Sequence, residues 1–371
     1  MSTFKDLGVH PNLVKRLKEM NIVIPTEIQH QTIPYLLEKS NNLVAQAQTG
    51  TGKTAAFGLP LIQKVSAKNA NVQALILSPT RELVQQIAKQ LFAFTKYYDK
   101  VYSVAVYGGP NMDRQLSLLS KPTQIIVATP GRLIDLLERK KINLDHIKTI
   151  VLDEADEMLR RGFKADIDTI LTYTKTKSDV WLFSATMPDD IQKIIKKFMS
   201  SGYKEVVIDA QYQVNKNITH EYVVVDSKEK LNAIHQFLRQ NKERRGVIFC
   251  NTKAESEKLN KQLKARNYLV DVLNGDMNQK EREKVMRAFK SNNINLLIAT
   301  DVAARGIDIA NLAFVLHHQL PSQIEYYTHR AGRTARAGNK GLSLAFVSPQ
   351  EKKHLKNIEK DLNIKFDITV I

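Results

Sequence analysis

Short apolar runs alternate with amphipathic, charge-rich segments from one end of this 371-residue chain to the other. Strands that are apolar throughout and are separated by helical patterns, such as those at 82–95 and 132–139, are typical of a parallel sheet with helices on both faces. The chain is therefore expected to have an α/β fold. The expected strands are 42–46, 74–78, 103–107, 124–128, 149–152 and 180–183, followed by 246–250, 269–273, 295–300, 313–316 and 342–347.

The alternation is interrupted once, near the middle of the chain. The stretch 210–219 (AQYQVNKNIT) is polar and lacks a helical stripe, which is typical of a linker. Because the chain is also too long for one ordinary core, we expect two domains at 1–208 and 218–371, joined by a linker at 209–217. The last helix is expected at 351–361, and no recognisable RNA-binding appendage follows it. The sequence is therefore expected to be a complete core.

Charge and composition limit the possible partners. The chain has 55 Lys and Arg against 38 Asp and Glu, a net charge of +17, which favours nucleic acid first and an anionic membrane second. Its one cysteine, Cys250, excludes an intrachain disulfide framework, and the scattered histidines indicate no structural metal. No apolar signal segment or stretch of about 18 apolar residues is present, so a cytoplasmic location without membrane contact is expected. A monomer is expected as well.

A glycine-rich segment, AQTGTGKT at 47–54, stands between the first expected strand and the next helix. Glycines at 50 and 52 let the backbone curl so that successive N–H groups point at one anion. The lysine supplies charge for the β- and γ-phosphates, and the last threonine hydroxyl can bind Mg²⁺. A ligand-free turn is the alternative, but Gly-Lys-Thr in this context favours a phosphate-binding loop. Its residues are Thr49, Gly50, Thr51, Gly52, Lys53 and Thr54.

Three carboxylates follow the apolar strand expected at 149–152. Asp153 at the strand end can hold Mg²⁺, directly or through water, and Glu154 can orient and deprotonate an attacking water. A solvated acidic turn is the alternative. Downstream of a phosphate loop and at the end of a buried strand, the carboxylates instead favour catalysis, and the two motifs together indicate an NTPase.

The string Asp-Glu-Ala-Asp at 153–156, together with the loop, resembles the DEAD-box family of ATP-dependent RNA helicases. The resemblance covers nearly the whole chain and implies two RecA-like domains that use ATP and Mg²⁺. The segment 25–29 (PTEIQ) matches the Q motif, which implies that Gln29 reads the adenine edge and that Phe4 stacks near the base. Anchoring of the N-terminal segment is the alternative for Phe4. Asn21 stands where the family usually has Gly.

Three further segments carry the resemblance. Residues 184–186 (SAT) match the third motif, which implies that their hydroxyls bond Asp156 and couple the nucleotide site to domain closure. Residues 300–308 (TDVAARGID) match the fifth motif and imply that Asp308 contacts the ribose. Residues 329–338 (HRAGRTARAG) resemble the sixth, with Ala331 and Ala335 where the family commonly has Ile and Gly. The implied coupling residues are Asp156, Ser184, Thr186 and His329.

The sixth motif also carries two arginines, Arg333 and Arg336. Because they are three residues apart, we expect them on one side of a helix. Across a cleft they can reach the γ-phosphate as arginine fingers and stabilise the charge that develops in phosphoryl transfer. Generic polyanion binding is the alternative for both.

Several loops at strand ends are candidates for gripping an RNA backbone, chiefly because of the resemblance. Two of them open helices, whose N-terminal N–H groups attract phosphates. Little base-reading chemistry is visible, so binding to single strands or short duplexes without sequence specificity is expected. The candidates are Pro79, Thr80, Arg81, Gly108, Gly109, Thr129, Pro130, Gly131 and Arg132, followed by Asn251, Thr252, Gln279, Arg282, Thr300 and Asp301.

The expected activity is RNA-stimulated ATP hydrolysis that closes two domains and locally separates short duplexes. An ATP-gated RNA clamp that hydrolyses slowly is one alternative. A DNA-acting helicase of the same superfamily is another, although it should lack the Gln29 module. The RNA substrate and any ribonucleoprotein or RNA-degradation partners are not specified by the sequence.

Overall fold

The computed structural model describes residues 2–38, 42–48, 50–109, 112–174, 178–199, 202–208, 217–304, 312–335 and 340–370. It divides into two compact units, Met1–Ala210 and Gln211–Ile371. Of the linker expected at 209–217, only Asn217 lies within the described residues. The expectation that the polar stretch 210–219 is all linker is wrong at its end. Ile218 and Thr219 already belong to a strand that pairs with the sheet of the C-terminal unit.

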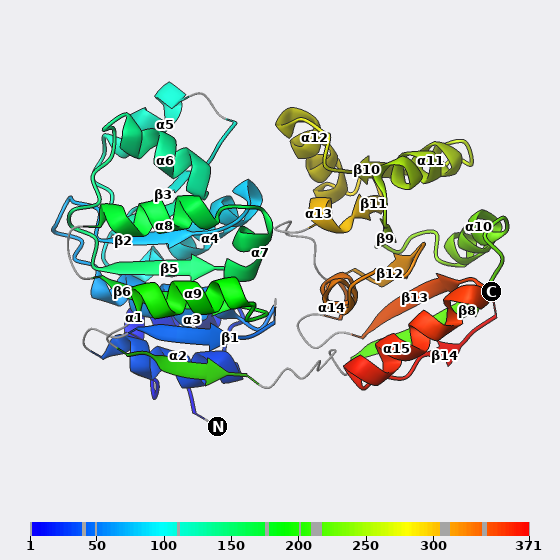
Figure 1. Cartoon of the computed structure of the whole chain (residues 1–371), viewed down its shortest axis with the longest axis horizontal. Coiled ribbons are helices and arrows are strands. Elements are labelled where there is room, and N and C mark those ends of the chain that lie inside the picture. The colour runs from blue at the N-terminus through cyan, green and yellow to red at the C-terminus, as the bar shows by residue number, and fades with distance from the viewer. Residues whose placement is uncertain are drawn as a thin grey trace. The chain divides into compact units, whose positions relative to one another are not determined.

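The N-terminal unit contains one parallel sheet with the strand order β3-β4-β2-β5-β6-β1-β7 (Figure 1). Its strands are β1 Leu43–Gln46, β2 Ala74–Leu77, β3 Ser103–Val106, β4 Ile125–Ala128, β5 Thr149–Asp153, β6 Asp179–Ser184 and β7 Lys204–Val207. Its α-helices are α1 Pro11–Glu19, α2 Glu27–Leu37, α3 Lys53–Lys64, α4 Arg81–Phe94, α5 Met112–Leu119, α6 Pro130–Glu138, α7 Ala155–Arg160, α8 Lys164–Tyr173 and α9 Asp189–Phe198.

The C-terminal unit contains a second parallel sheet, with the order β10-β11-β9-β12-β13-β8-β14. Its strands are β8 Ile218–Val224, β9 Gly246–Cys250, β10 Val270–Leu273, β11 Leu296–Thr300, β12 Phe314–His317, β13 Gly341–Val347 and β14 Asp367–Ile368. Its α-helices are α10 Lys230–Gln240, α11 Lys253–Lys264, α12 Gln279–Lys290, α13 Asp301–Ala304, α14 Ile324–Ala331 and α15 Lys352–Leu362. Short 3₁₀ turns lie at Thr95–Tyr97 and Pro349–Glu351.

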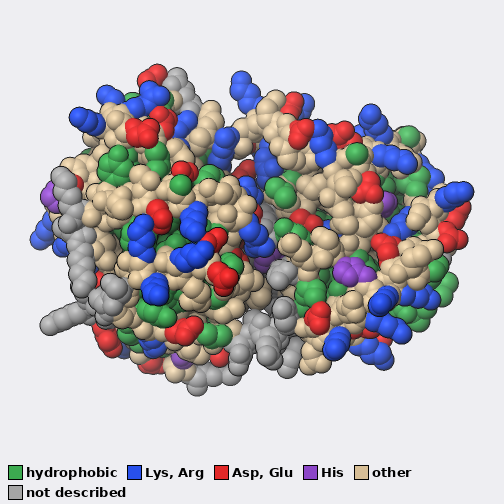
Figure 2. Space-filling view, in the orientation of Figure 1, with side chains coloured by type: hydrophobic (Ala, Val, Ile, Leu, Met, Phe, Trp, Pro, Cys, Tyr) green, Lys and Arg blue, Asp and Glu red, His purple; other side chains and the backbone are tan. Residues whose placement is uncertain are grey.

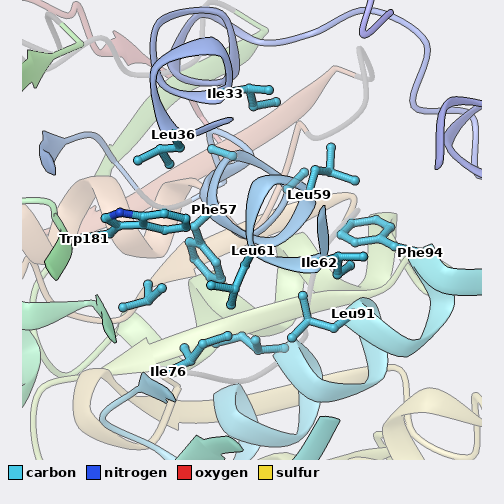
Figure 3. Close-up of a cluster of buried hydrophobic side chains, with 14 of the residues drawn as sticks. Ile33, Leu36, Phe57, Leu59, Leu61, Ile62, Ile76, Leu91, Phe94 and Trp181 are labelled. Carbon is cyan, nitrogen blue, oxygen red and sulfur yellow. The ribbon is translucent and has the colours of Figure 1, made fainter. Parts of the chain in front are cut away.

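Strands that are buried on both faces explain why the sheets form. On β2, Ala74 and Ile76 belong to one apolar cluster while Leu75 and Leu77 belong to another, because successive side chains alternate between faces. Helices α1 to α4 cover the first face and α6 to α9 the second. Figure 3 shows part of the first cluster, in which Trp181 lies near Phe57. The expected α/β fold is confirmed.

The two sheets have the same topology. Counted from the first strand of each unit, both follow the order 3-4-2-5-6-1-7. Loops that follow equivalent strands therefore occupy equivalent places, and the carboxyl ends of all parallel strands in one unit lie at one edge of its sheet. Three neighbouring strands, β3, β4 and β2, have β10, β11 and β9 as their counterparts.

Lys and Arg side chains are spread over the visible face of each unit, interspersed with Asp and Glu (Figure 2). This mixed surface carries the net charge of +17. None of the helices within the described residues is long and apolar enough to cross a membrane.

Candidate nucleotide and RNA sites

The glycine-rich segment lies between β1 and α3, as the sequence predicts. Gly50 and Gly52 have φ values of 86° and 90°, in the left-handed region that glycine adopts readily. Lys53 begins α3, and its buried ammonium donates to the Ala47 carbonyl at 3.1 Å. The segment therefore brings a lysine and a helix N-terminus to one place, the arrangement that binds phosphates. Thr49 lies outside the described residues.

Residues of the Q motif are fastened to this loop. Gln29 Nε2 donates to the Gly52 carbonyl at 3.0 Å, and Thr26 Oγ1 donates to the Thr51 carbonyl at 2.8 Å. Gln29 Oε1 also accepts from the Thr26 N–H at 2.9 Å. A glutamine amide has two donors and two acceptor lone pairs, so one N–H and one lone pair remain for an adenine edge.

Asn21 and Phe4 each have a local structural explanation. Asn21 has a φ of 58°, the left-handed conformation in which Asn is the best substitute for Gly. The exchange is therefore compatible with the local backbone. The Phe4 ring is only 2% exposed and packs within the apolar cluster that covers the first face of the N-terminal sheet. This burial favours the anchoring interpretation of Phe4 over stacking on a base.

Asp153 and Glu154 stand where β5 ends and α7 begins. Burial raises the pKa of the Asp153 carboxyl to about 7, although the nearby Lys53 ammonium lowers it. Glu154 has a φ of 52° and a ψ of 50°, and its N–H donates to Asp153 Oδ1 at 3.1 Å. A non-glycine residue in the left-handed region is strained, and such residues concentrate at functional sites.

The donor set at β5 and α3 fits a magnesium ion. Mg²⁺ is commonly held by one or two protein carboxylates, with phosphate oxygens and waters completing its ligands. Asp153 would supply the carboxylate and Thr54, next to Lys53 on α3, the hydroxyl. A bound cation would also keep the buried Asp153 carboxylate ionised. Its charge would add to that of Lys53 and offset the effect of burial.

Asp153→Asn is expected to stabilise the nucleotide-free protein while removing its ATPase activity. The folded pKa of about 7 lies above the ordinary value of 3.8, so the folded state holds this proton more tightly. The contribution of this carboxyl group to the free energy of unfolding is therefore fully present below pH 3.8 and is lost as the pH rises through 7. At pH 8 the neutral amide should raise the free energy of unfolding by about 1–4 kcal/mol, measured by denaturant titration.

The control for this variant is Asp99→Asn, which neutralises an exposed carboxylate of the same unit. It should leave stability and activity nearly unchanged. The stabilisation by Asp153→Asn should also shrink as the pH falls toward 4. Equal stability of wild type and Asp153→Asn at pH 8 would contradict the burial of an ionised carboxylate.

The third motif contacts the last aspartate of the carboxylate string. Asp156 Oδ2 accepts from Thr186 Oγ1 at 2.8 Å and from the Thr186 N–H at 3.1 Å. The Asp156 N–H donates to Ser184 Oγ at 3.2 Å, and this hydroxyl donates to the Thr186 carbonyl at 2.7 Å. The ends of β5 and β6 are thereby tied together.

In the N-terminal unit, the RNA-binding candidates gather after the three neighbouring strands β2, β3 and β4. Thr80 caps α4 by accepting from the Leu83 N–H at 3.2 Å, and Pro130 begins α6 after Thr129. The Arg81 guanidinium packs on Gly108 and Gly109, and a Cβ added at Gly109 would collide with it. Arg132 Nη1 is buried with no hydrogen-bond partner within the described residues. The site thus has two helix N-termini and two arginines. Gly131 lies between Pro130 and Arg132 in the first turn of α6.

The C-terminal candidates follow the equivalent strands. Gln279 begins α12, with Asn278 as its N-cap, and donates to Glu283 Oε1 at 3.1 Å. Arg282, one turn further, donates to the Ala303 carbonyl. Thr300 is buried at the end of β11, and Asp301 begins α13. The structure therefore places these residues at the ends of neighbouring strands, as in the N-terminal unit.

Arg330 is a site residue that the sequence analysis missed. Its side chain is 1% exposed and holds both Asp301 oxygens, at 2.6 and 2.7 Å. It also donates to Asn251 Oδ1 at 2.8 Å and to the Gln319 carbonyl at 2.8 Å. Arg330 thus connects the ends of β9, β11 and β12, and the Asp301 carboxylate is already engaged by this arginine. The only sequence signal for this contact was that Asp301 and Arg330 each belong to one of the matched motifs.

The expectation that Arg333 and Arg336 share a helix is wrong for Arg333, which lies after the end of the helix. Helix α14, which carries His329, ends at Ala331, and Gly332 caps it. Thr334 Oγ1 then donates to the Leu312 carbonyl, and Ala335 adopts a φ of 54°, which no α-helix contains. Arg333 therefore lies between two anchored residues, Arg330 and Thr334. Arg336 and Asp308 lie outside the described residues.

Ala335 is expected to be a strained position. It is 1% exposed and left-handed, a conformation that costs a non-glycine residue about 1–2 kcal/mol. Ala335→Gly should stabilise the chain by about 0.5–1 kcal/mol, because glycine loses part of this gain in the unfolded state. Ala335→Val should destabilise it clearly, because a β-branched residue disfavours positive φ most. Denaturant titration that gives the opposite order would contradict this backbone.

Two family models match the chain. A DEAD/DEAH box helicase model matches residues 26–194, and a helicase conserved C-terminal domain model matches residues 229–338. The chain is 43% identical over 361 residues to an ATP-dependent RNA helicase CshA of Listeria monocytogenes, covering 97% of this chain and 69% of that protein. A CshA of Limosilactobacillus reuteri is 44% identical over 358 residues, covering 96% and 71%.

Solved structures resemble the whole chain. Dbp5 of S. cerevisiae, bound to RNA and ADP BeF3, has a TM-score of 0.89 at 30% identity, with 100% of this chain and 96% of that chain covered. The helicase Mss116 bound to ssRNA and UDP-BeF has a TM-score of 0.85 at 29% identity, with 100% and 81% covered. Both sheets therefore match RecA-like domains.

Proposed function

This chain belongs to the DEAD-box family of ATP-dependent RNA helicases, and from that premise we propose that RNA-stimulated ATP hydrolysis closes its two units and separates short RNA duplexes. It is an ATP-dependent enzyme of this family. The proposed steps are binding of ATP with Mg²⁺, binding of RNA across both units, closure, hydrolysis and release.

One observation carries the proposal, namely the separation of the chemical groups between strands and units. In the N-terminal sheet, the phosphate loop and carboxylates follow β1 and β5, while the RNA candidates follow the contiguous strands β3, β4 and β2. The C-terminal sheet repeats this division, with its RNA candidates after β9 and β11 and on α12, which follows β10. Arg333 follows α14, the helix after β12. One RNA strand can then be held by equivalent edges of two similar units.

The N-terminal unit would bind and orient ATP. Gln29 would read the adenine edge, and Lys53 with the N–H groups of the loop would hold the phosphates. Mg²⁺, when bound through Asp153 and Thr54, would neutralise charge on the phosphates. Glu154 would take the proton of the attacking water, and Asp156 would transmit closure through Ser184 and Thr186.

The C-terminal unit would complete the reaction centre on closure. Arg333 and Arg336 would stabilise the charge that develops at the γ-phosphate. RNA would favour closure because it contacts both units, and ATP would favour RNA binding in return, as linkage requires. Recognition through the backbone explains why no sequence preference is expected.

The decisive experiment compares ATPase stimulation by single-stranded RNA and DNA of equal length and sequence. RNA should stimulate ATP turnover and DNA should leave it at the basal rate, because only RNA offers the 2′-OH. Equal stimulation by DNA would favour a DNA-acting helicase. A parallel assay with a short RNA duplex distinguishes a clamp, which would hydrolyse ATP slowly and separate no strands.

A further inference from the structure

A cavity of about 480 Å³ opens at the amino ends of the strands of the C-terminal sheet. It is formed by the second half of α10, the segment between α10 and β9, the turn between α11 and β10, and the amino end of β11. The motif loops follow the carboxyl ends of the same strands, roughly 15 Å away for strands of this length. Figure 1 shows α10 and α11 at the right of this unit. The cavity therefore belongs to neither of the sites described above.

Four cationic side chains line this cavity, and no carboxylate does so among the described residues. Within the described residues, the side chains of two of them donate hydrogen bonds to neutral amides. Arg266 donates to Asn232 Oδ1 at 2.9 Å, and Arg244 donates to Asn241 Oδ1 at 3.2 Å. Arg239 and Lys242 are exposed and make no ion pair within the described part of the chain. Four cations around one hollow, none of them in an ion pair within the described residues, create a positive potential there.

Stabilisation of helix ends explains only part of this charge. Arg239 lies in the last turn of α10 and Arg266 follows α11, where cations complement the helix dipoles. Lys242 and Arg244 lie beyond the helix, between α10 and β9, so the dipoles do not account for them. Their convergence on a hollow of this size is typical of an anion-binding pocket.

The rest of the lining suits a nucleoside. His235 and Tyr268 form an edge-to-face aromatic pair, with Tyr268 Oη 2.8 Å from His235 Nδ1. Leu269 is 58% exposed, which gives an apolar surface for a base. Burial, followed by the charges of Arg266 and Arg239, lowers the pKa of His235, in keeping with the positive field.

We propose that this pocket binds a free nucleoside polyphosphate, with the cations at Arg239, Lys242, Arg244 and Arg266 on the phosphates and the base beside Tyr268 and Leu269. The volume fits a ligand of this size. The site is separate from the phosphate loop, so the chain has a second nucleotide site in its C-terminal unit. This site does not depend on the proposed helicase cycle.

The test uses the full chain carrying Lys53→Ala, which weakens phosphate binding at the loop, with tripolyphosphate and GTP as probes. NMR signals of the His235 and Tyr268 rings should shift saturably, and the pKa of His235 should rise when the anion is bound. GTP should bind more tightly than tripolyphosphate, because only GTP carries a base. The double change Arg239→Glu and Lys242→Glu should weaken both probes by about tenfold or more.

The matched control is the pair Lys353→Glu and Lys356→Glu, which reverses two exposed charges on α15 in the same unit. It should leave both affinities unchanged. Equal weakening by both pairs, no saturable shift, or equal affinity for GTP and tripolyphosphate would contradict the proposal. So would an unstructured RNA oligomer that shifts the same signals and displaces tripolyphosphate, because the phosphates would then come from RNA.

Discussion

Arg333→Ala is expected to lower RNA-stimulated ATP turnover by about 10³-fold or more, with little change in ATP affinity. An arginine finger contacts the γ-phosphate most strongly when charge develops on it, so its loss affects the transition state more than the bound substrate. The chain around Arg333 is anchored on both sides, because Arg330 is held by Asp301 and Thr334 is bonded to the Leu312 carbonyl. Steady-state kinetics with a separate ATP-binding titration measures both quantities.

Arg139→Ala is the control for loss of one arginine, because Arg139 is exposed at the end of α6 and, within the described residues, pairs only with Asp135. It should leave turnover unchanged. Arg333→Lys keeps the charge but loses the planar fork, so it should recover only part of the activity. Equal losses in turnover and ATP affinity for Arg333→Ala would contradict the finger role and favour simple anion binding.

Glu154→Gln is expected to slow hydrolysis by about 10²–10⁴-fold while ATP and RNA still bind. Glutamine keeps the size and polarity of the side chain but cannot accept the proton of the attacking water. The variant should therefore accumulate a complex with both ligands, detectable as slow release of labelled RNA in the presence of ATP. Glu154 adopts a left-handed backbone between the end of β5 and the start of α7, directly after Asp153.

Glu138→Gln, an exposed change on the same unit, serves as the charge control for Glu154→Gln and should leave hydrolysis and RNA release at wild-type levels. Unchanged turnover in Glu154→Gln would show that another group activates the water. A fall in ATP affinity as large as the fall in turnover would instead indicate a binding role for Glu154.

The buried strands could be predicted from sequence because their apolar runs are continuous. Three strands, β7, β8 and β14, could not. β7 exposes most of its residues and β14 exposes both, while β8 has three polar residues in a row, so none has the continuous apolar signal of a buried strand. Pairing with neighbouring strands, rather than local sequence, decides these segments.

Local motifs predicted the nucleotide loop and carboxylates, because each is a short segment whose chemistry is complete in itself. Arg330 was missed because its partners Asp301 and Asn251 lie 29 and 79 residues away in the chain. The helix expected around Arg333 ends early because Thr334 finds a partner in Leu312, a contact that no helical spacing reveals. The anchoring of Phe4 could not be settled from sequence either, because it depends on the apolar cluster in which the ring is buried.

The central claim is that the two units carry complementary parts of one reaction centre and come together over RNA. The most direct measurement is a crystal structure of the full chain with a non-hydrolysable ATP analogue, Mg²⁺ and an RNA oligomer. The account predicts the Arg333 guanidinium at hydrogen-bond distance from the γ-phosphate, with RNA across the ends of β2, β3 and β4 and of β9, β10 and β11. An Arg333 side chain that faces bulk solvent, far from the nucleotide, would contradict it.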